Sequence, residues 1–274
     1  MRLFRLQNII GVSVFSCFLV LPAPSQQPTQ DAASPRQPVL VELFTSEGCS
    51  DCPPADEVLK ELDSTQPVAG AQAIVLSEHV TYWDHQGWRD PFSLAQMTER
   101  QQEYVDRFGL DDGYTPQVVV DGAAQMVGNN SAGVTRAVAV AAAVPKPELV
   151  IKDARWQDGV ARFSVQGTAA PVARLVAVLA VDASHSEVLG GENRGRTLHH
   201  VAVVRVMKDF GGDAADGRAL QLADGELDRG IEATAPVRLV VFQVDHYTGR
   251  VIAVAEQTLS RPTQMHGAGV FHSR

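Results

Sequence analysis

Val41 to Pro54 reads Val-Glu-Leu-Phe-Thr-Ser-Glu-Gly-Cys-Ser-Asp-Cys-Pro-Pro, and this stretch decides the fold. An apolar, β-branched run interrupted only by Glu42 predicts a buried strand. The pair Cys49 and Cys52 follows, and apolar residues then recur at helical spacing as far as Leu62. The stretch therefore predicts a strand followed by a helix, with a Cys-Ser-Asp-Cys pair at their junction.

Strands and helices alternate after this stretch. The sequence predicts a strand at 73–76, a helix at 94–108 with a capping box formed by Ser93 and Gln96 and an end at Gly109, a strand at 117–120, a strand at 125–127 and a helix at 131–144. The order β-α-β-α-β-β-α is typical of a layered α/β domain with a mixed sheet. We assign residues 38–145 to this domain, which ends in a stiff linker at 145–147.

The pattern changes in the second half of the chain. Strands separated by turn residues are expected at 149–156, 160–166, 175–181, 201–207, 239–244 and 251–255. No long helical pattern interrupts them, so residues 146–262 are predicted to form an all-β, sandwich-like domain. Residues 26–37 and 263–274 are expected to be a flexible lead and a flexible tail.

The N-terminus has the features of a targeting segment. Arg2 and Arg5 precede an apolar run at 9–21, and small residues follow it. This arrangement is typical of a secretory signal peptide, here assigned to 1–25, and the run is too short to span a bilayer. We expect an exported protein, periplasmic or secreted, with no transmembrane segment after cleavage.

Charge and cysteine content narrow the function further. The 274 residues carry a formal net charge of −9, which argues against nucleic-acid binding because phosphate recognition needs a basic surface. Of the three cysteines, Cys17 leaves with the signal peptide, so only Cys49 and Cys52 remain. A disulfide between two cysteines this close closes a very short loop, so it adds little stability. The pair is either an inert bridge or a redox site.

A Cys-x-x-Cys pair before a helix favours thiol–disulfide chemistry. Cys49 is expected to be the solvent-exposed nucleophile and Cys52 the resolving thiol. The charge of Asp51 disfavours the Cys49 thiolate, and the prolines after Cys52 move the predicted helix start towards Pro54. A buried Glu42 could accept a proton from Cys52; the alternative is an acid at a sheet edge or facing solvent.

Four stretches carry a resemblance to a known family: 41–54, 79–88, 114–122 and 191–198. They resemble an exported bacterial family of unknown function with a thioredoxin-like fold, which implies the fold and export but no activity. In thioredoxin-like proteins the proline before the third strand is cis and packs against the disulfide, and the preceding backbone pairs with substrate. The resemblance implies these roles for Pro116 and Thr115.

Aromatic residues gather near this predicted site. Trp83 and Trp88, together with Tyr114, could form a wall that receives a peptide or small ligand. The alternative is that the tryptophans bury an irregular loop against the sheet. In the second half, Arg194 and Arg196 beside Glu192 suggest either an anion site or, more commonly, an ion-pair network.

Three functions follow from these patterns. The first is an exported thiol–disulfide oxidoreductase whose partners are protein or small-molecule thiols and disulfides, with no cofactor. The second is a copper carrier that holds Cu(I) through Cys49, Cys52 and His79, since soft thiolates suit that ion. The third is a non-enzymatic envelope module with a static disulfide. We rank the oxidoreductase first.

Overall fold

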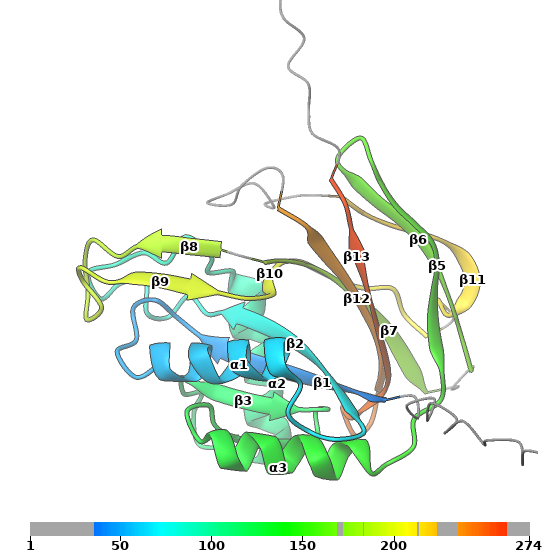
Figure 1. Ribbon diagram of the computed structural model, residues 1–274, viewed down its shortest axis with the longest axis horizontal. Coiled ribbons are helices and arrows are strands. Elements are labelled where there is room, and N and C mark those ends of the chain that lie inside the picture. Colours follow the sequence, from blue (N-terminus) through cyan, green and yellow to red (C-terminus); the bar gives the residue numbers. More distant parts are fainter. Residues whose placement is uncertain (1–35, 169–171, 183, 213, 224–234, 262–274) are drawn as a thin grey trace, which may run out of the picture. The chain divides into compact units, whose positions relative to one another are not determined.

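The computed structural model describes residues 36–168, 172–182, 184–212, 214–223 and 235–261 (Figure 1). The predicted signal peptide, most of the lead and the predicted tail lie outside these ranges. In the described part of the chain, no helix has the length and apolar character needed to cross a membrane.

The first half has the predicted order of elements. It contains β1 (Gln37–Thr45), α1 (Pro53–Thr65), β2 (Ala71–His79), α2 (Ala95–Phe108), β3 (Gln117–Val120), β4 (Ala124–Val127) and α3 (Ser131–Ala142). The helix after the cysteines begins at Pro53, as the prolines predict, because a first-turn proline gives up no helical hydrogen bond.

The second half contains only strands among its described residues, as predicted. They are β5 (Leu149–Gln157), β6 (Val160–Gly167), β7 (Ala173–Val181), β8 (Ser184–Glu187), β9 (Thr197–His200), β10 (Val203–Asp209), β11 (Asp216–Ala223), β12 (Val237–Asp245) and β13 (Val251–Leu259).

Both halves contribute to one sheet. Its eight strands have the order β13-β12-β7-β10-β2-β1-β3-β4. β1 and β2 are parallel, whereas β3 is antiparallel to β1. β10 joins β2 at one register position, Val203 opposite Ser77. The described residues from 36 onward belong to one compact unit. The eight-stranded sheet contains strands from both sides of the boundary predicted at 145/146. Local strand patterns contain no information on this distant pairing.

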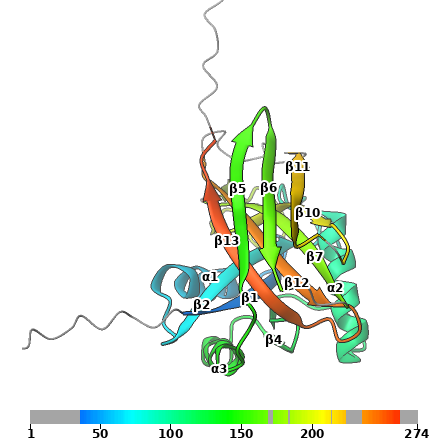
Figure 2. The same ribbon diagram turned by 90° about the vertical axis from the view of Figure 1, so that its right-hand side faces the viewer.

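A second layer covers part of this sheet. β11, β6 and β5 form a three-stranded sheet that packs on β7, β12 and β13 through an apolar cluster that includes Phe163, Leu179 and Val241 (Figure 2). This pair of layers agrees with the sandwich-like packing expected for the second half. β8 and β9 form a separate two-stranded ribbon.

The helices lie on both faces of the first-half strands (Figure 1). On β1, Leu43 packs in the cluster that contains Ala55 and Leu59 of α1, whereas Phe44 packs against Tyr104 of α2. Because neighbouring strand residues point to opposite faces, α1 and α2 cover opposite sides of the sheet. α3 packs on the α1 side through Val134 and Val138.

The capping box expected for α2 is wrong. The N-cap is Leu94, which has no side-chain cap. The Ser93 hydroxyl instead donates to Asp84 Oδ2 at 2.8 Å, and Gln96 Nε2 donates to the carbonyl of Met207 at 3.1 Å. Both side chains therefore bond residues outside the helix instead of forming the capping box. Gly109 ends the helix in the left-handed conformation, as predicted.

Candidate functional site

Cys49 and Cys52 form a disulfide at the start of α1, with their Cα atoms 5.4 Å apart. Cys52 is the N-cap residue of the helix, and its carbonyl accepts from the amide of Asp56 at 3.0 Å. Cys52 and Asp56 are four residues apart, so their side chains share one face of α1. The sequence therefore places a carboxylate one helical turn from the second cysteine.

The prediction of a solvent-exposed Cys49 is wrong. Cys49 is 1% exposed and Cys52 is fully buried, while the intervening Ser50 and Asp51 are exposed. Residues far along the chain contact the cysteine turn, and local sequence patterns do not show such contacts.

Residues 188–196, which we call the cover loop, connect β8 to β9 and lie over the cysteines. Asn193 Nδ2 donates to the carbonyl oxygens of Glu47 at 2.9 Å and Cys49 at 2.8 Å. The backbone amide of Ser50 donates to Glu192 Oε2 at 3.0 Å. Glu192 thus binds the cysteine turn, whereas Arg194 and Arg196 are exposed.

Pro116 lies on the side of the sheet covered by α1, and Thr115 precedes it. The Thr115–Pro116 peptide bond is cis, as the resemblance implies. A Cβ built on Gly128 would lie 3.0 Å from Ala55 Cβ and 3.3 Å from Pro116 Cβ, so Pro116 is next to the first turn of α1. Trp83 Nε1 donates to Thr115 Oγ1 at 2.8 Å.

The aromatic side chains have structural partners. Trp83 Cβ would lie 3.0 Å from a Cβ on Gly48, so this tryptophan connects the cysteine turn to Thr115. Trp88 Nε1 donates to Glu47 Oε2 at 2.9 Å. The hydroxyl of Tyr114 donates to Gln125. These contacts favour the interpretation that the tryptophans bury an irregular loop.

Glu42 is buried as predicted, but it faces away from Cys52. Its carboxylate accepts from Arg100 Nε and from the Tyr104 hydroxyl, each at 2.6 Å, and both residues belong to α2. Since α1 covers the opposite face, Glu42 is not placed to accept a proton from Cys52. Glu78 of β2 lies 3.6 Å from Arg100. We call Glu42, Glu78, Arg100 and Tyr104 the arginine cluster.

A second buried group of charges lies beside the cysteines, and its members were not predicted together. It consists of Glu47, Asp56, His79, Asp90 and His200, which we call the histidine cluster. His200 Nε2 lies 3.2 Å from Glu47 Oε1, and His200 Nδ1 lies 3.7 Å from Asp56 Oδ2. His79 Nδ1 lies 2.7 Å from Asp90 Oδ2, and the two imidazole rings are 4.6 Å apart.

The histidine cluster has shifted protonation equilibria. Burial alone lowers the pKa of His200, but the carboxylates of Asp56 and Glu47 outweigh it and raise the pKa to about 10. Burial raises the pKa of Asp90, yet His79 and the amides of Glu47 and Phe92 outweigh it and lower the pKa. His200 is therefore an imidazolium at neutral pH, enclosed by carboxylates.

Only part of the histidine cluster had a signal in the sequence. Glu47 and Asp56 flank the cysteine pair, and Asp56 could have been identified from its position four residues after Cys52. His200 lies in β9, and nothing in its neighbourhood indicates that it reaches α1.

The ligand set expected for copper is not assembled. Within the described ranges, no group of three or more histidine, cysteine or acidic side chains is arranged to hold a metal ion. His79 is fully buried, with one ring nitrogen on Asp90 and the other 3.4 Å from Ser77 Oγ. Its ring is thus held away from a role as third ligand.

Comparisons with known proteins identify a family and a fold. The family model described as "Protein of unknown function (DUF1223)" matches residues 40–242. A crystal structure of a protein from Agrobacterium tumefaciens, solved in a structural genomics programme, is similar, with a TM-score of 0.62 and 21% identity. The match covers 85% of this chain and 99% of that one. No curated protein matches the chain.

Proposed function

The chain belongs to the DUF1223 family of proteins of unknown function, and we propose that it is an exported thiol–disulfide oxidoreductase with a thioredoxin-like fold. The observation that carries this proposal is the disulfide between Cys49 and Cys52 at the first turn of α1, on the same side of the sheet as Pro116. A helix N-terminus stabilises a thiolate. In thioredoxin-like proteins, which this chain resembles, the backbone before the cis proline pairs with substrate.

We write the proposed exchange as the oxidation of a dithiol partner; the dithiothreitol-reduced protein runs the same steps in reverse and reduces a disulfide. A thiolate of the partner attacks Cys49 Sγ, the Cys49–Cys52 bond breaks, and Cys52 leaves as a thiolate. The second thiol of the partner then attacks the partner sulfur of the mixed disulfide and releases Cys49. The partner ends as a disulfide, and the two electrons and two protons it loses give two cysteine thiols.

Asp56 replaces Glu42 in this proposal as the group that exchanges a proton with Cys52. Its carboxylate lies one turn from Cys52 and accepts from Thr45 Oγ1 at 2.9 Å. His200, 3.7 Å from the other carboxylate oxygen, supplies the nearest positive charge.

Exchange requires the cover loop to move, because both sulfur atoms are buried. The loop is closed on itself: the amide of Val188 donates to Arg196 O at 2.9 Å, and the amide of Gly195 donates to Val188 O at 2.7 Å. It can therefore move as a unit when Asn193 and Glu192 release the cysteine turn. The cover loop thus controls access in this proposal.

The test uses a Cys17→Ser background, so that only the pair reacts. Dithiothreitol-reduced protein is expected to reduce insulin disulfides, and Cys49→Ser is expected to abolish the reaction. Ser260→Ala, at an exposed position just after β13, is the control and keeps the rate. An unchanged rate in the Cys49→Ser variant removes the proposal.

The burial of both cysteines favours a second candidate, a binding module with a static disulfide. Asn193 and Glu192 fix the cysteine turn in this interpretation, and no electrons are exchanged. A reduction potential below about −300 mV, together with no insulin reduction, identifies this function. A pair that cycles readily with glutathione excludes it.

A further inference from the structure

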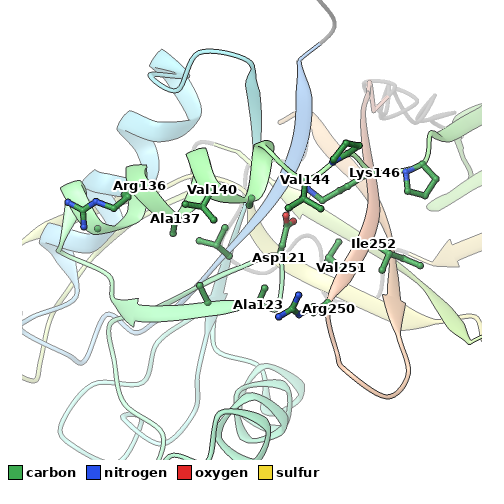
Figure 3. A pocket seen from close by; sticks show the side chains of 16 residues that line it. Asp121, Ala123, Arg136, Ala137, Val140, Val144, Lys146, Arg250, Val251 and Ile252 are labelled. Atoms are coloured by element: carbon green, nitrogen blue, oxygen red, sulfur yellow. The ribbon is translucent and has the colours of Figure 1, made fainter.

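A groove lies between α3 and the start of β13, and neither cysteine lines it (Figure 3). Its volume is about 720 Å³, within the range of small-molecule sites. α3 forms one wall, the turn between β3 and β4 forms another, and Val251 and Ile252 belong to the third. None of its lining residues belongs to either charged cluster or to the cover loop.

The lining is mostly apolar, and part of it is exposed. Val140 is 65% exposed and Val144 is 59% exposed. Val140 belongs to α3, and Val144 lies two residues past its end at Ala142, so the exposed apolar track runs from the last turn of the helix into the segment that follows it. The small side chains of Ala137 and Ala141 also line this track. Val138 of the same helix is fully buried on the other side. α3 therefore has two apolar faces, and only one is used by the core.

Positive charge accompanies this apolar track. Three basic side chains and one acidic side chain line the groove. Lys146 is neutralised, because its Nζ lies 2.6 Å from Asp121 Oδ2. Arg136 and Arg250 are exposed, and their guanidinium groups have no ion pair or hydrogen bond within the described part of the chain. A local excess of two cations is notable in a protein with a net charge of −9.

The walls are held in place by tight backbone contacts. A Cβ on Gly122 would lie 2.2 Å from the carbonyl oxygen of Gly249, so the β3–β4 turn packs directly on the β12–β13 turn. The amide of Val251 donates to the carbonyl of Asp121 at 2.8 Å. Lys146 also donates to the carbonyl of Pro38 at 2.8 Å, which fastens the predicted linker to β1. The groove is therefore preformed.

We propose that this groove binds an anionic amphiphile, a single acyl chain with a carboxylate or phosphate head group. The apolar track along α3 takes the chain, and Arg136 or Arg250 takes the head. Arginine suits both head groups because its planar fork donates two parallel hydrogen bonds to carboxylate or phosphate oxygens. A cationic head group would be repelled by the two guanidinium groups, and a neutral head group would gain no charge-assisted hydrogen bond from them.

The experiment measures binding of dodecanoate and dodecyl phosphate by isothermal titration calorimetry, below their micelle concentrations. Dodecyltrimethylammonium and dodecyl maltoside carry the same chain with a cationic and a neutral head. We expect saturable, one-to-one binding of the anionic probes only. The ratio of the two anionic affinities shows whether the carboxylate or the phosphate is the better head group.

Charge-reversal variants assign the site. Reversing the charge of the arginine that takes the head group, by Arg136→Glu or by Arg250→Glu, is expected to weaken binding about tenfold or more, since it removes the charge-assisted contact. Arg89→Glu, at an exposed position outside the groove, is the matched control and leaves affinity unchanged. Val140→Asp is expected to abolish binding, and thermal unfolding of each variant checks that it is folded.

Three outcomes overturn the proposal. The first is equal affinity for all four probes, and the second is unchanged affinity in both arginine variants. The third is a dimer in sedimentation equilibrium of the ligand-free protein that Val140→Asp dissociates, because a second copy of the chain would then cover the groove.

Discussion

The arginine cluster and the histidine cluster occupy opposite faces of the same strands, and each encloses one cation among carboxylates. In the arginine cluster, Arg100 lies between Glu42 and Glu78, and neither oxygen of Glu78 has a hydrogen bond among the described residues. In the histidine cluster, the carboxylates of Glu47 and Asp56 have several donors besides His200. The arginine cluster depends on the permanent charge of Arg100, whereas the histidine cluster depends on the proton that makes His200 an imidazolium.

The clusters also differ in their origin along the chain. β1, β2 and α2 supply the whole arginine cluster, so it belongs to the first half. The histidine cluster needs His200 from β9 and is closed by Asn193 of the cover loop. The difference teaches that the charged groups beside the cysteines come from both halves of the chain, whereas all the charged groups of the arginine cluster come from the first half, with Phe242 of β12 packed against Arg100.

Removing the guanidinium charge of Arg100 tests the arginine cluster and has the largest expected effect. Arg100→Met leaves Glu42 buried without its cation, so the free energy of unfolding is expected to fall by about 3–5 kcal/mol. Urea denaturation measures it. Arg107→Met, on the same helix and more exposed, is the control, with an expected loss below about 1 kcal/mol. Equal losses would contradict the central role of Arg100.

Removing the imidazolium of His200 tests the histidine cluster. His200→Asn is expected to cost about 2–3 kcal/mol at pH 6, less than Arg100→Met, because Glu47 keeps donors from Trp88 and Ser186. The pKa of His200 is raised from 6.5 to about 10, so its stabilising contribution is complete below pH 6.5 and disappears as the pH rises towards 10.

Urea denaturation between pH 6 and pH 10 checks this dependence. The stability difference between the wild type and His200→Asn should shrink steadily across that range. A difference that stays constant with pH would show that His200 is not charged in the folded protein.

A third prediction concerns the contact between the cover loop and the cysteine turn. Asn193→Ala removes two hydrogen bonds to the cysteine turn, which is expected to cost about 1–2 kcal/mol. The rate at which dithiothreitol reduces the Cys49–Cys52 disulfide should rise. Asn129→Ala, at an exposed position near α3, is the control and should change neither quantity. An unchanged reduction rate in Asn193→Ala would show that Asn193 does not limit access.

The smallest expected effect is a gain. Burial raises the pKa of Glu78 well above its usual value, helped by the charge of Glu42 and opposed by Arg100. A raised pKa means that stability is complete at low pH and is lost as the pH rises through the folded-state value. Glu78→Gln should therefore be more stable than the wild type at pH 8 and equal to it at pH 4. Thermal unfolding at both values measures the change.

The sequence predicts local features of this fold well and distant ones poorly. Helical spacing and β-branched runs predict the order of elements in the first half, and the position of Pro116 before β3 is confirmed. The burial of Glu42 is also confirmed, but not the face it occupies, because that depends on which residue of β1 meets α1. Strand alternation alone does not fix this register.

The errors share a physical cause. Residues 188–200 contact the cysteine turn and supply His200 to the histidine cluster, and β10, which follows them, pairs with β2. That join rests on a single register position, and a pattern within one strand cannot specify it. The substitutions above therefore test what the sequence alone left open.

The late position of the cover loop in the chain has a consequence for biosynthesis. As the polypeptide emerges from its N-terminus, β1, α1 and both cysteines are made well before Asn193 and His200. The nascent chain therefore presents the two sulfur atoms to its surroundings for a limited time. An oxidase that acts on this protein has its easiest access in that interval, before the remaining strands seal the turn.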